Sequence, residues 1–466
     1  MPARISGSGA LRRARPSLSV TRVCAAPSGG SRPVSYSDRV SETVFTYSAP
    51  SLKFGSGASS EVGHDLVGLV GTSVARGEGR VLLITDAGVA ATGHPERIAG
   101  EISTHGLSVT TYDGVRVEPT DASLVEAIEF ARAEGPFHAI VAVGGGSAID
   151  TAKAVNLLTT NPGELMDYIN APVGKARPPV EPLLPLVAIP TTTGTGSEST
   201  TICVLDVLSL KVKTGISHVA LRPRLAVVDP SLTMSQPAMV TAAAGMDILC
   251  HALESYTARW FGDFDAKRPE ERVPYCGANP VADMWSEKSL SLLAGSFRTA
   301  VGEGSSVEAR EQMALAATFA GLGFGNAGVH IPHAGAYPIA GRVRDYRPVG
   351  YPDDEAIVPH GMAVSLTAPE AFRFTFDASP ERHLHAARLL EPGVGGDGPD
   401  VLPGVLARLM SDIAIPNGLA EVGFGEHDVD DLVEGALKQQ RLLATAPKEV
   451  TPDDLAGVFR GSMEHW

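Results

Sequence analysis

Residues 44 to 232 alternate short apolar runs with helical patterns, and this alternation constrains the fold more than any other feature of the chain. The runs at 81–86, 138–143, 186–189 and 225–229 are typical of buried strands, and each ends in turn residues. Strands that alternate with helices form a parallel sheet, because each connection must cross back before the next strand begins. We therefore predict an α/β domain whose ligands bind at the carboxyl edge of a parallel sheet.

After Pro230 the pattern becomes helical. Residues 246–258, 281–300, 306–321 and 405–413 have helical periodicity, with no comparable strand-like run. Segments 341–358 and 391–400 are rich in Pro, Gly and Asp and are predicted loops. We predict three parts, which are a flexible N-terminal extension (1–43), an α/β domain (44–232) and a mostly helical domain (233–466).

The composition excludes several classes of protein. The chain has 466 residues, 44% of them hydrophobic and 20% charged, which is ordinary for a globular protein of two or three domains. Its formal net charge of −15 argues against nucleic acid or an anionic membrane as a main partner, because phosphate binding needs clustered positive charge. No run approaches the ~18 apolar residues of a membrane-spanning helix. The four cysteines have no C-x-x-C spacing, so they indicate neither a disulfide framework nor a structural zinc site.

The N-terminal stretch differs from the rest of the chain. Residues 1–37 hold six arginines and no acidic residue. An Arg- and Ser-rich, acid-poor start is typical of a mitochondrial transit peptide, and a disordered extension or an over-long start has the same composition. The apolar run needed for twin-arginine export is missing. We expect the mitochondrial matrix if this stretch is a transit peptide, and the cytoplasm if the chain is bacterial.

Two glycine-rich loops follow predicted strands. GGGSAID (144–150) comes directly after the strand at 138–143, and PTTTGTGSE (190–198) follows the strand at 186–189. Glycines let backbone amides approach an anion, and a helix that starts near Ser147 adds the positive end of its dipole, which suits a pyrophosphate. An ordinary tight turn explains either loop alone, but two such loops on neighbouring strand ends suit a dinucleotide.

Asp86 ends the first predicted strand. An acid at this place accepts hydrogen bonds from ribose hydroxyls and repels a 2′-phosphate, which favours NAD over NADP. A role as the N-cap of the next helix explains its position nearly as well.

The helical half contains residue types that suit a divalent metal. Asp247 and His251 are four residues apart, which places them on one face of a helix, and His330, His333 and His360 follow. Three neutral imidazoles and a carboxylate suit Fe²⁺ or Zn²⁺ and poorly suit Mg²⁺ or Ca²⁺. Isolated histidines are more often surface or core residues, so the spacing alone leaves both interpretations open.

Taken together, these motifs resemble the iron-containing (group III) alcohol dehydrogenase family. The resemblance rests on GGGSAID, PTTTGTGSE, the Asp247/His251 pair, His333 and the PHG tripeptide at 359–361. Four further stretches, 112–120, 210–216, 251–256 and 321–330, look like the hydroxyacid-oxoacid transhydrogenase branch of that family. The resemblance runs from about residue 44 to the C-terminus. It implies the fold of dehydroquinate synthase and the iron alcohol dehydrogenases, with an α/β dinucleotide-binding domain on a parallel sheet, an all-α metal-binding domain, and the active site between them.

The resemblance also implies the site residues and the cofactors. By motif position it assigns as metal ligands Asp247, His251, His333 and His360. To the nucleotide site it assigns Asp86, Gly145, Gly146, Ser147, Asp150, Thr191, Thr192, Thr195 and Lys213. It implies tightly bound NAD and a divalent metal, with Fe²⁺ preferred, although the ligand types suit Zn²⁺ equally.

The implied reaction is a transhydrogenation between small acids. 4-Hydroxybutyrate is oxidised to succinate semialdehyde, and the retained NADH reduces 2-oxoglutarate to 2-hydroxyglutarate, with a divalent metal as Lewis acid and NAD as hydride carrier. The partners are thus small hydroxy- and oxo-acids, and a homo-oligomer is compatible with the sequence. Two alternatives remain, because one fold supports several activities. They are a conventional NAD-dependent iron-containing alcohol dehydrogenase that releases NADH and, more distantly, a metal-dependent lyase of the dehydroquinate synthase type.

Substrate handling is predicted to involve two further residues and a loop. Many relatives have a histidine in a proton relay four residues after the third metal ligand, where this chain has Tyr337, so we predict that this phenol is catalytic. His330 is the second predicted catalytic residue, because it shares a face with His333 if the segment is helical. His330 and the arginines of segment 341–347, Arg344 among them, are the candidates for holding a substrate carboxylate. A solvated loop is the alternative for the arginines.

Overall fold

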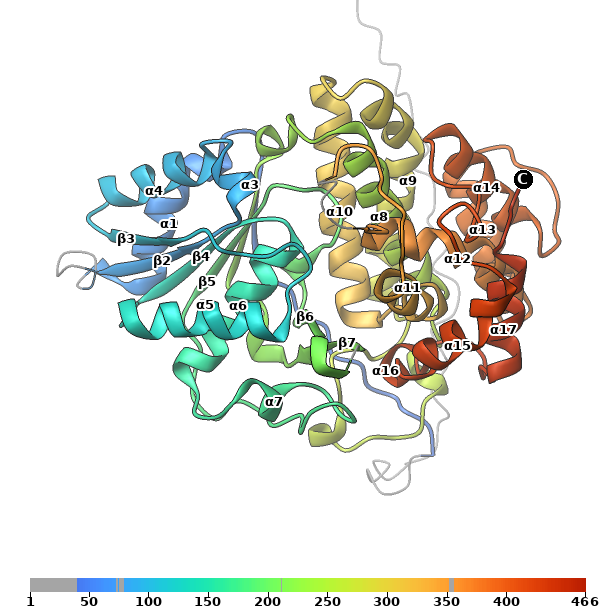
Figure 1. Cartoon of the computed structure of the whole chain (residues 1–466), viewed down its shortest axis with the longest axis horizontal. Coiled ribbons are helices and arrows are strands. Elements are labelled where there is room, and N and C mark those ends of the chain that lie inside the picture. Colours follow the sequence, from blue (N-terminus) through green and yellow to red (C-terminus); the bar gives the residue numbers. More distant parts are fainter. Residues whose placement is uncertain (1–39, 73, 75–78, 211, 352–355) are drawn as a thin grey trace, which may run out of the picture. The chain divides into compact units, whose positions relative to one another are not determined.

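In the computed structural model, which describes residues 40–72, 74, 79–210, 212–351 and 356–466, the first half of the chain forms a six-stranded parallel sheet (Figure 1). Its strands, in spatial order, are β1 (Ser51–Phe54), β8 (Leu225–Val228), β5 (Leu186–Pro190), β4 (Ala139–Gly144), β2 (Arg80–Ile84) and β3 (Ser108–Tyr112). The predicted strands correspond to β2, β4, β5 and β8. The sequence pattern misses β1 and β3, which lie at the two edges of the sheet, where partly exposed polar residues interrupt the apolar run. Most of the predicted N-terminal extension lies outside the described residues.

Helices cover both faces of this sheet (Figure 1). The helices are α1 (Val62–Val70) and α4 (His94–Thr104) on one face, and α5 (Asp121–Glu134) and α6 (Gly146–Thr160) on the other. Leu83 of β2 packs in the core of the first pair, and its neighbours Leu82 and Ile84 pack in the core of the second. Because successive side chains point to opposite faces, a strand covered on both sides is apolar throughout, which explains the uninterrupted runs.

The strand order reverses between β2 and β4. These strands are neighbours, but the chain continues from β2 to β3 on one side and from β4 to β5 on the other. In open α/β sheets such a reversal leaves a crevice at the carboxyl ends of the strands, where ligands bind. Asp86 follows β2 after one intervening residue and Gly145 follows β4 directly, so the fold places both predicted nucleotide residues at this crevice.

Smaller elements complete the first half. They are the short helices α3 (Ala87–Ala90) and α7 (Leu165–Tyr168) and the antiparallel strands β6 (Ile202–Val207) and β7 (Val212–Ser217). The sequence pattern does not predict the β6–β7 pair. It contacts α6 and α11, and so lies between the sheet and the helical half.

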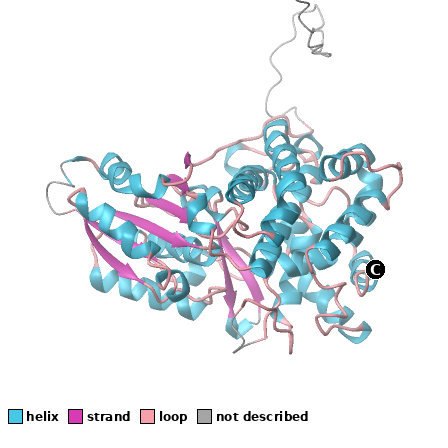
Figure 2. Cartoon of the chain, turned by 90° about the horizontal axis from the view of Figure 1, so that it is seen from above, coloured by secondary structure: helices cyan, strands magenta, loops and turns pink. Residues whose placement is uncertain are grey.

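The second half is helical among its described residues (Figures 1 and 2). Its helices are α8 (Ala238–Thr257), α9 (Pro280–Gly302), α10 (Val307–Ala327), α11 (Ile331–Gly341), α12 (His360–Thr375), α13 (Pro380–Leu390), α14 (Val401–Asp412), α15 (Val429–Leu437), α16 (Gln440–Leu443) and α17 (Pro452–Gly461). The four predicted helices correspond to α8, α9, α10 and α14, and the predicted loops fall between α11 and α12 and between α13 and α14. The boundary predicted at residue 232 lies between β8 and α8.

Helix α8 is central, since it packs against α9, α10 and α12. Among the described helices none is by itself long and apolar enough to span a membrane. Helices α10 and α11 reach that length and composition only together, across a 104° bend.

Gly361 allows α12 to begin directly against α8. A Cβ atom at this position would lie 2.1 Å from the carbonyl oxygen of Ala243 and 2.7 Å from Cβ of Asp247, and no side chain fits such distances. The neighbouring His360 is thereby held next to Asp247.

We expect Gly361→Ala to destabilise the protein by about 1–3 kcal/mol, because α12 must move away from α8 to admit a methyl group. The control is Gly302→Ala at the end of α9, where a Cβ meets no atom within 4 Å. Thermal unfolding should show a lower midpoint for Gly361→Ala only. Equal midpoints for the two variants would contradict the packing argument.

Candidate active site

Three imidazoles converge on one carboxylate oxygen. Oδ1 of Asp247 lies 3.7 Å from Nε2 of His251, 3.4 Å from Nε2 of His333 and 3.8 Å from Nε2 of His360. Atoms that bind one ion tetrahedrally at ~2.0–2.1 Å are roughly 3.3 Å apart, so this spacing suits ligands of a single ion. The ligand atoms of Asp247, His251 and His333 all lie within 4.8 Å of one another, and His360 joins this set through the shared oxygen.

Helix positions explain the convergence. Asp247 and His251 lie one turn apart on α8, as predicted, while His333 is in the first turn of α11 and His360 is the first residue of α12. Helix α12 packs against both α8 and α11 and so brings the ligand-bearing residues of the three helices together.

The chemistry of these groups fits a cation. Asp247 Oδ1 and His333 Nε2 are buried and have no hydrogen-bond partner among the described residues, which is rare for polar atoms unless a ligand satisfies them. Burial lowers the pKa of His251 to about 3, so its imidazole is neutral and has a lone pair to donate.

Glu254 orients His333, and the sequence interpretation missed it. Its Oε1 lies 2.6 Å from Nδ1 of His333, and its Oε2 accepts the backbone N–H of His330 at 2.6 Å. Burial alone would lower the pKa of His333, but Glu254 and Asp247 raise it to about 9. A carboxylate that holds the Nδ1 proton turns Nε2 toward the other ligands. The sequence does contain a signal for this role, because Glu254 follows His251 by three residues and so lies on the same helix face.

The metal-ligand candidates and the glycine-rich loops line one pocket, which we call the central pocket. Its empty volume is about 800 Å³, including its open mouth, within the usual range for ligand sites. Its lining includes Gly146, Ser147, Asp150, Thr195 and Lys213 from the predicted nucleotide site, Asp247, His251, His333 and His360 from the predicted metal site, and Tyr275, Phe324, Tyr337, Arg441 and Leu442. The structure therefore brings the two predicted sites together.

The two glycine-rich loops lie edge to edge. Strands β4 and β5 are paired in parallel with Gly144 opposite Pro190, so both loops leave the sheet at the same edge. A Cβ at Gly146 would lie 2.8 Å from a side-chain atom of Thr195, so only glycine allows this contact. No side chain caps the N-terminus of α6, which leaves its first N–H groups for an anion.

The other predicted nucleotide residues lie outside the central pocket, with Gly145, Thr191 and Thr192 on these loops and Asp86 after β2. Asp86 accepts the N–H of Val89 with Oδ1 at 2.9 Å, which confirms its role as an N-cap, and its Oδ2 lies 3.5 Å from the Cβ position of Gly144. A Cβ at Gly145 would lie 3.2 Å from Oγ1 of Thr192. Asp86 thus faces the glycine-rich loop, and its contact with ribose stays a prediction.

Two predicted nucleotide residues already have protein partners. Asp150 accepts hydrogen bonds from the Ser197 hydroxyl at 2.5 Å and from a backbone N–H of β6 at 2.9 Å. Lys213 pairs with Glu118 and, at 3.4 Å, with Asp206. These contacts fix the pocket wall.

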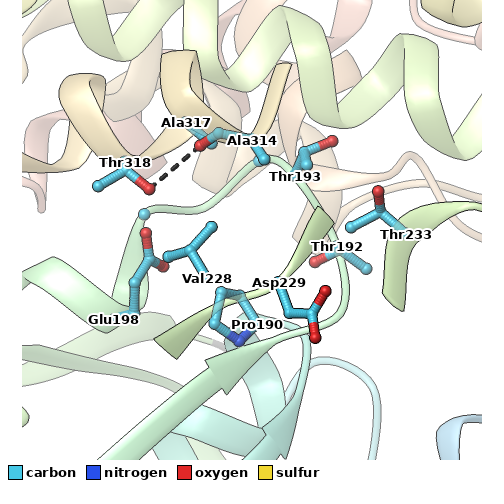
Figure 3. A pocket seen from close by; sticks show the side chains of 12 residues that line it. Pro190, Thr192, Thr193, Glu198, Val228, Asp229, Thr233, Ala314, Ala317 and Thr318 are labelled. Carbon is cyan, nitrogen blue, oxygen red and sulfur yellow. Dashed lines mark hydrogen bonds between the residues drawn. The ribbon is translucent and has the colours of Figure 1, made fainter. Parts of the chain in front are cut away.

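A second, smaller pocket lies behind the loop that follows β5 (Figure 3). Thr192 and Asp229 lie on one side of it and Glu198 on the other, with Val228 between them. Asp229 accepts hydrogen bonds from the hydroxyls of Ser59 and Ser231 at 2.6 Å each, so its charge is used in joining the turn after β1 to the turn after β8. Thr191 lines neither pocket and is buried.

The groups predicted to hold a substrate carboxylate do not line the central pocket. His330 is fully buried, with Nε2 3.1 Å from Oγ1 of Thr257. It is the N-cap of α11, with φ −137° and ψ −118°, so it lies before the helix and does not share a helical face with His333. Arg344 pairs with Asp428. The geometry therefore does not favour substrate contact by His330 or Arg344.

Tyr337 does line the central pocket. Its ring centre lies 6.1 Å from the ring centre of His360, with 28° between the planes. Burial raises the pKa of Tyr337 to about 12, so the phenol keeps its proton near neutral pH. Its catalytic role stays a prediction.

Two further residues of the pocket were not predicted. The ring of Phe324 stacks on His251 at 3.8 Å, with 7° between the planes. Arg441 enters the wall from the short helix α16. Phe324 lies in the stretch 321–330, where the resemblance gave it no role, and Arg441 lies in no motif, so only the tertiary structure reveals their place in the pocket.

Comparison with known proteins gives a consistent result. Residues 50–230 match the family profile "Iron-containing alcohol dehydrogenase", and residues 271–463 match "Fe-containing alcohol dehydrogenase family, C-terminal". The chain is 42% identical to the mitochondrial hydroxyacid-oxoacid transhydrogenase of Rattus norvegicus and 41% identical to that of Homo sapiens, each over 438 residues and 92% of both chains.

Solved structures agree with these sequence matches. A 1,3-propanediol oxidoreductase superposes with a TM-score of 0.77 at 31% identity, and an alcohol dehydrogenase from Oenococcus oeni with 0.77 at 26%. Each match covers 90% of this chain and 100% of the other.

We expect His251→Ala to lose the bound metal, because it removes one of the converging imidazoles. Glu254→Gln should keep all four ligands and bind the metal about 10- to 100-fold more weakly, since a less basic partner then orients His333. Elemental analysis and chelator competition measure both effects, with Glu434→Gln on the surface of α15 as the control. Full metal occupancy with normal activity in His251→Ala would contradict the site.

We expect NAD preference to depend on the charge of Asp86. Asp86→Asn keeps an N-cap for α3 and removes the charge that faces a 2′-phosphate, so the preference should fall on the order of tenfold. Asp86→Gly should relax it as well. Dissociation constants for NAD and NADP are the readout, and an unchanged ratio in both variants would exclude this role.

Proposed function

Since this chain belongs to the iron-containing alcohol dehydrogenase family, we propose that it works as a hydroxyacid-oxoacid transhydrogenase with 4-hydroxybutyrate and 2-oxoglutarate as substrates. It is an oxidoreductase, and it shares 41–42% identity with transhydrogenases over 92% of its length. The observation that carries the proposal is the central pocket. The glycine-rich loop 144–150 and the four metal-ligand candidates line the same space there. A hydride carrier and a polarising cation can thus act on one small substrate.

The residues fit the cofactors that the family implies. The unpartnered Asp247 Oδ1 and His333 Nε2 suit a divalent ion, and the uncapped N-terminus of α6 suits the pyrophosphate of NAD. When bound, the metal polarises the reacting oxygen of the substrate, and NAD takes up and returns the hydride. We propose Fe²⁺ from the family membership, although the nitrogen and oxygen ligands accept Zn²⁺ equally.

The chain's own residues have separate tasks in this proposal. Glu254 keeps the proton of His333 on Nδ1. Phe324 and Leu442 contribute apolar surface that limits water in the central pocket. Tyr337, which lines the pocket beside His360, is the proposed relay residue.

The proposed reaction requires no exchange of the nucleotide cofactor. Oxidation of 4-hydroxybutyrate to succinate semialdehyde releases one hydride and one proton, and reduction of 2-oxoglutarate to 2-hydroxyglutarate consumes both. No net NADH or proton is produced, so we propose that NAD stays bound while the acids exchange.

A conventional alcohol dehydrogenase that releases NADH in every cycle is the second candidate. The likeness to the 1,3-propanediol oxidoreductase favours it. The two candidates differ in the fate of the hydride, and not in the site.

The relatives quoted above are named as mitochondrial. We propose the matrix for this chain if residues 1–43 act as a transit peptide, and a reporter fused to these residues tests that directly. A reporter that stays in the cytosol would argue against it.

We expect purified enzyme with far less NAD than substrate to convert 4-hydroxybutyrate and 2-oxoglutarate together. With deuterium on C4 of 4-hydroxybutyrate, the 2-hydroxyglutarate formed should carry deuterium on C2, and added unlabelled NADH should not dilute it. Mass spectrometry gives the label, and NADH absorbance should stay constant. Label lost to the NADH pool would instead support the conventional dehydrogenase.

A further inference from the structure

We propose that Arg441 binds the substrate carboxylate and thereby selects acids whose carboxylate lies two methylene groups from the reacting carbon. This inference rests on the proposed function and identifies the substrate-binding residue within the same pocket. It replaces His330 and Arg344, which lie elsewhere.

Arg441 is the cation of the central pocket whose charge has no acidic partner among the described residues. Its Nη1 is buried and makes no hydrogen bond there, and no carboxylate of the described chain pairs with it. Lys213, the other cation of the wall, is already paired with Glu118 and Asp206. A buried guanidinium donor without an acceptor is costly, and an anionic ligand removes that cost.

The surroundings hold Arg441 in place. Its guanidinium lies over the ring of Tyr275, 4.8 Å from the ring centre. Leu442 is buried, and Oγ1 of Thr445 donates to the carbonyl of Val329 at 2.6 Å, which ties the α16 segment to the segment before α11. Such a fixed cation loses little conformational freedom when it binds a carboxylate bidentately.

The neighbouring side chains do not neutralise this charge. Burial raises the pKa of Tyr275, so its phenol remains uncharged. The walls around it include Ile202, Val329 and Leu442, and a low-dielectric wall strengthens an ion pair.

One such cation can hold the carboxylate that all four proposed reactants share. In 4-hydroxybutyrate and succinate semialdehyde, two methylene groups separate C4 from the carboxylate. In 2-oxoglutarate and 2-hydroxyglutarate, two methylene groups separate C2 from the distal carboxylate. A single arginine at a fixed distance from the metal-ligand cluster therefore positions the reacting carbon in both half-reactions.

The test is Arg441→Leu, assayed with NADH as reductant of succinate semialdehyde and of butanal, which has the same carbon count and no charge. We expect kcat/KM for succinate semialdehyde to fall about 10- to 100-fold, mainly through KM, which is the range of a charge-assisted contact. Butanal reduction should change less than about threefold, which also shows that the variant is folded. Arg441→Lys should recover part of the loss, and Arg408→Leu, a surface arginine paired with Glu391, is the control.

Chain length gives a second readout. The wild type should prefer 4-hydroxybutyrate over 3-hydroxypropanoate and 5-hydroxypentanoate, and Arg441→Leu should lose that preference. Glutarate should bind wild-type holoenzyme more tightly than Arg441→Leu in calorimetry.

Two outcomes would overturn the inference. One is an equal loss, or none, for succinate semialdehyde and butanal in Arg441→Leu. The other is a loss confined to the acid in Arg344→Leu. If wild-type enzyme fails to transfer deuterium between the two acids, the proposed function is wrong, whereas normal transfer with unchanged acid preference in Arg441→Leu refutes only the role of Arg441.

Discussion

The burial of Asp247 among three imidazoles is the interaction on which the rest of the site depends. A carboxylate inside a helical core is unfavourable unless its charge is compensated. The ligands that would share a compensating cation with it come from three helices at once, because α8 carries Asp247 and His251, α11 brings His333 and α12 begins with His360. The helices must approach closely for this, and Gly361 removes the side chain that would keep α12 and α8 apart. The close packing of α8 against α12 and the geometry of the site therefore depend on each other.

The sheet contributes the other half of the site by topology. The reversal between β2 and β4 opens the crevice, and the pairing of β4 with β5 brings two glycine-rich loops to the same edge. The β6–β7 pair, which supplies Lys213, connects this edge to the helical half. The central pocket is lined by both halves of the chain, which contribute different kinds of groups. A small acid that fits between them meets both.

Sequence patterns predict the elements whose structure depends on residues close together in the sequence. Buried central strands have continuous apolar runs, so β2, β4, β5 and β8 are evident, whereas edge strands such as β3 carry polar residues and are missed. The metal-ligand candidates and the glycine-rich loops lie in motifs, so the resemblance could predict them. His330 was expected to share a helical face with His333, but α11 begins one residue after it. Sequence patterns do not place a helix boundary to within one residue. Arg441 comes from a four-residue helix far along the chain, and only tertiary packing brings it into the pocket.

The contacts of Glu254 also affect how the protein selects its metal. Its carboxylate binds the side chain of His333 and the backbone N–H of His330 at the start of α11. Helices α8 and α11 are therefore joined by hydrogen bonds that do not involve the metal. A ligand set that is held in this way does not need a particular cation to assemble it. The nitrogen and oxygen ligand types accept both Fe²⁺ and Zn²⁺, so the supply of divalent metals in the compartment helps to decide which one is bound. The same chain, made in two cells with different iron and zinc levels, would be expected to contain different metals.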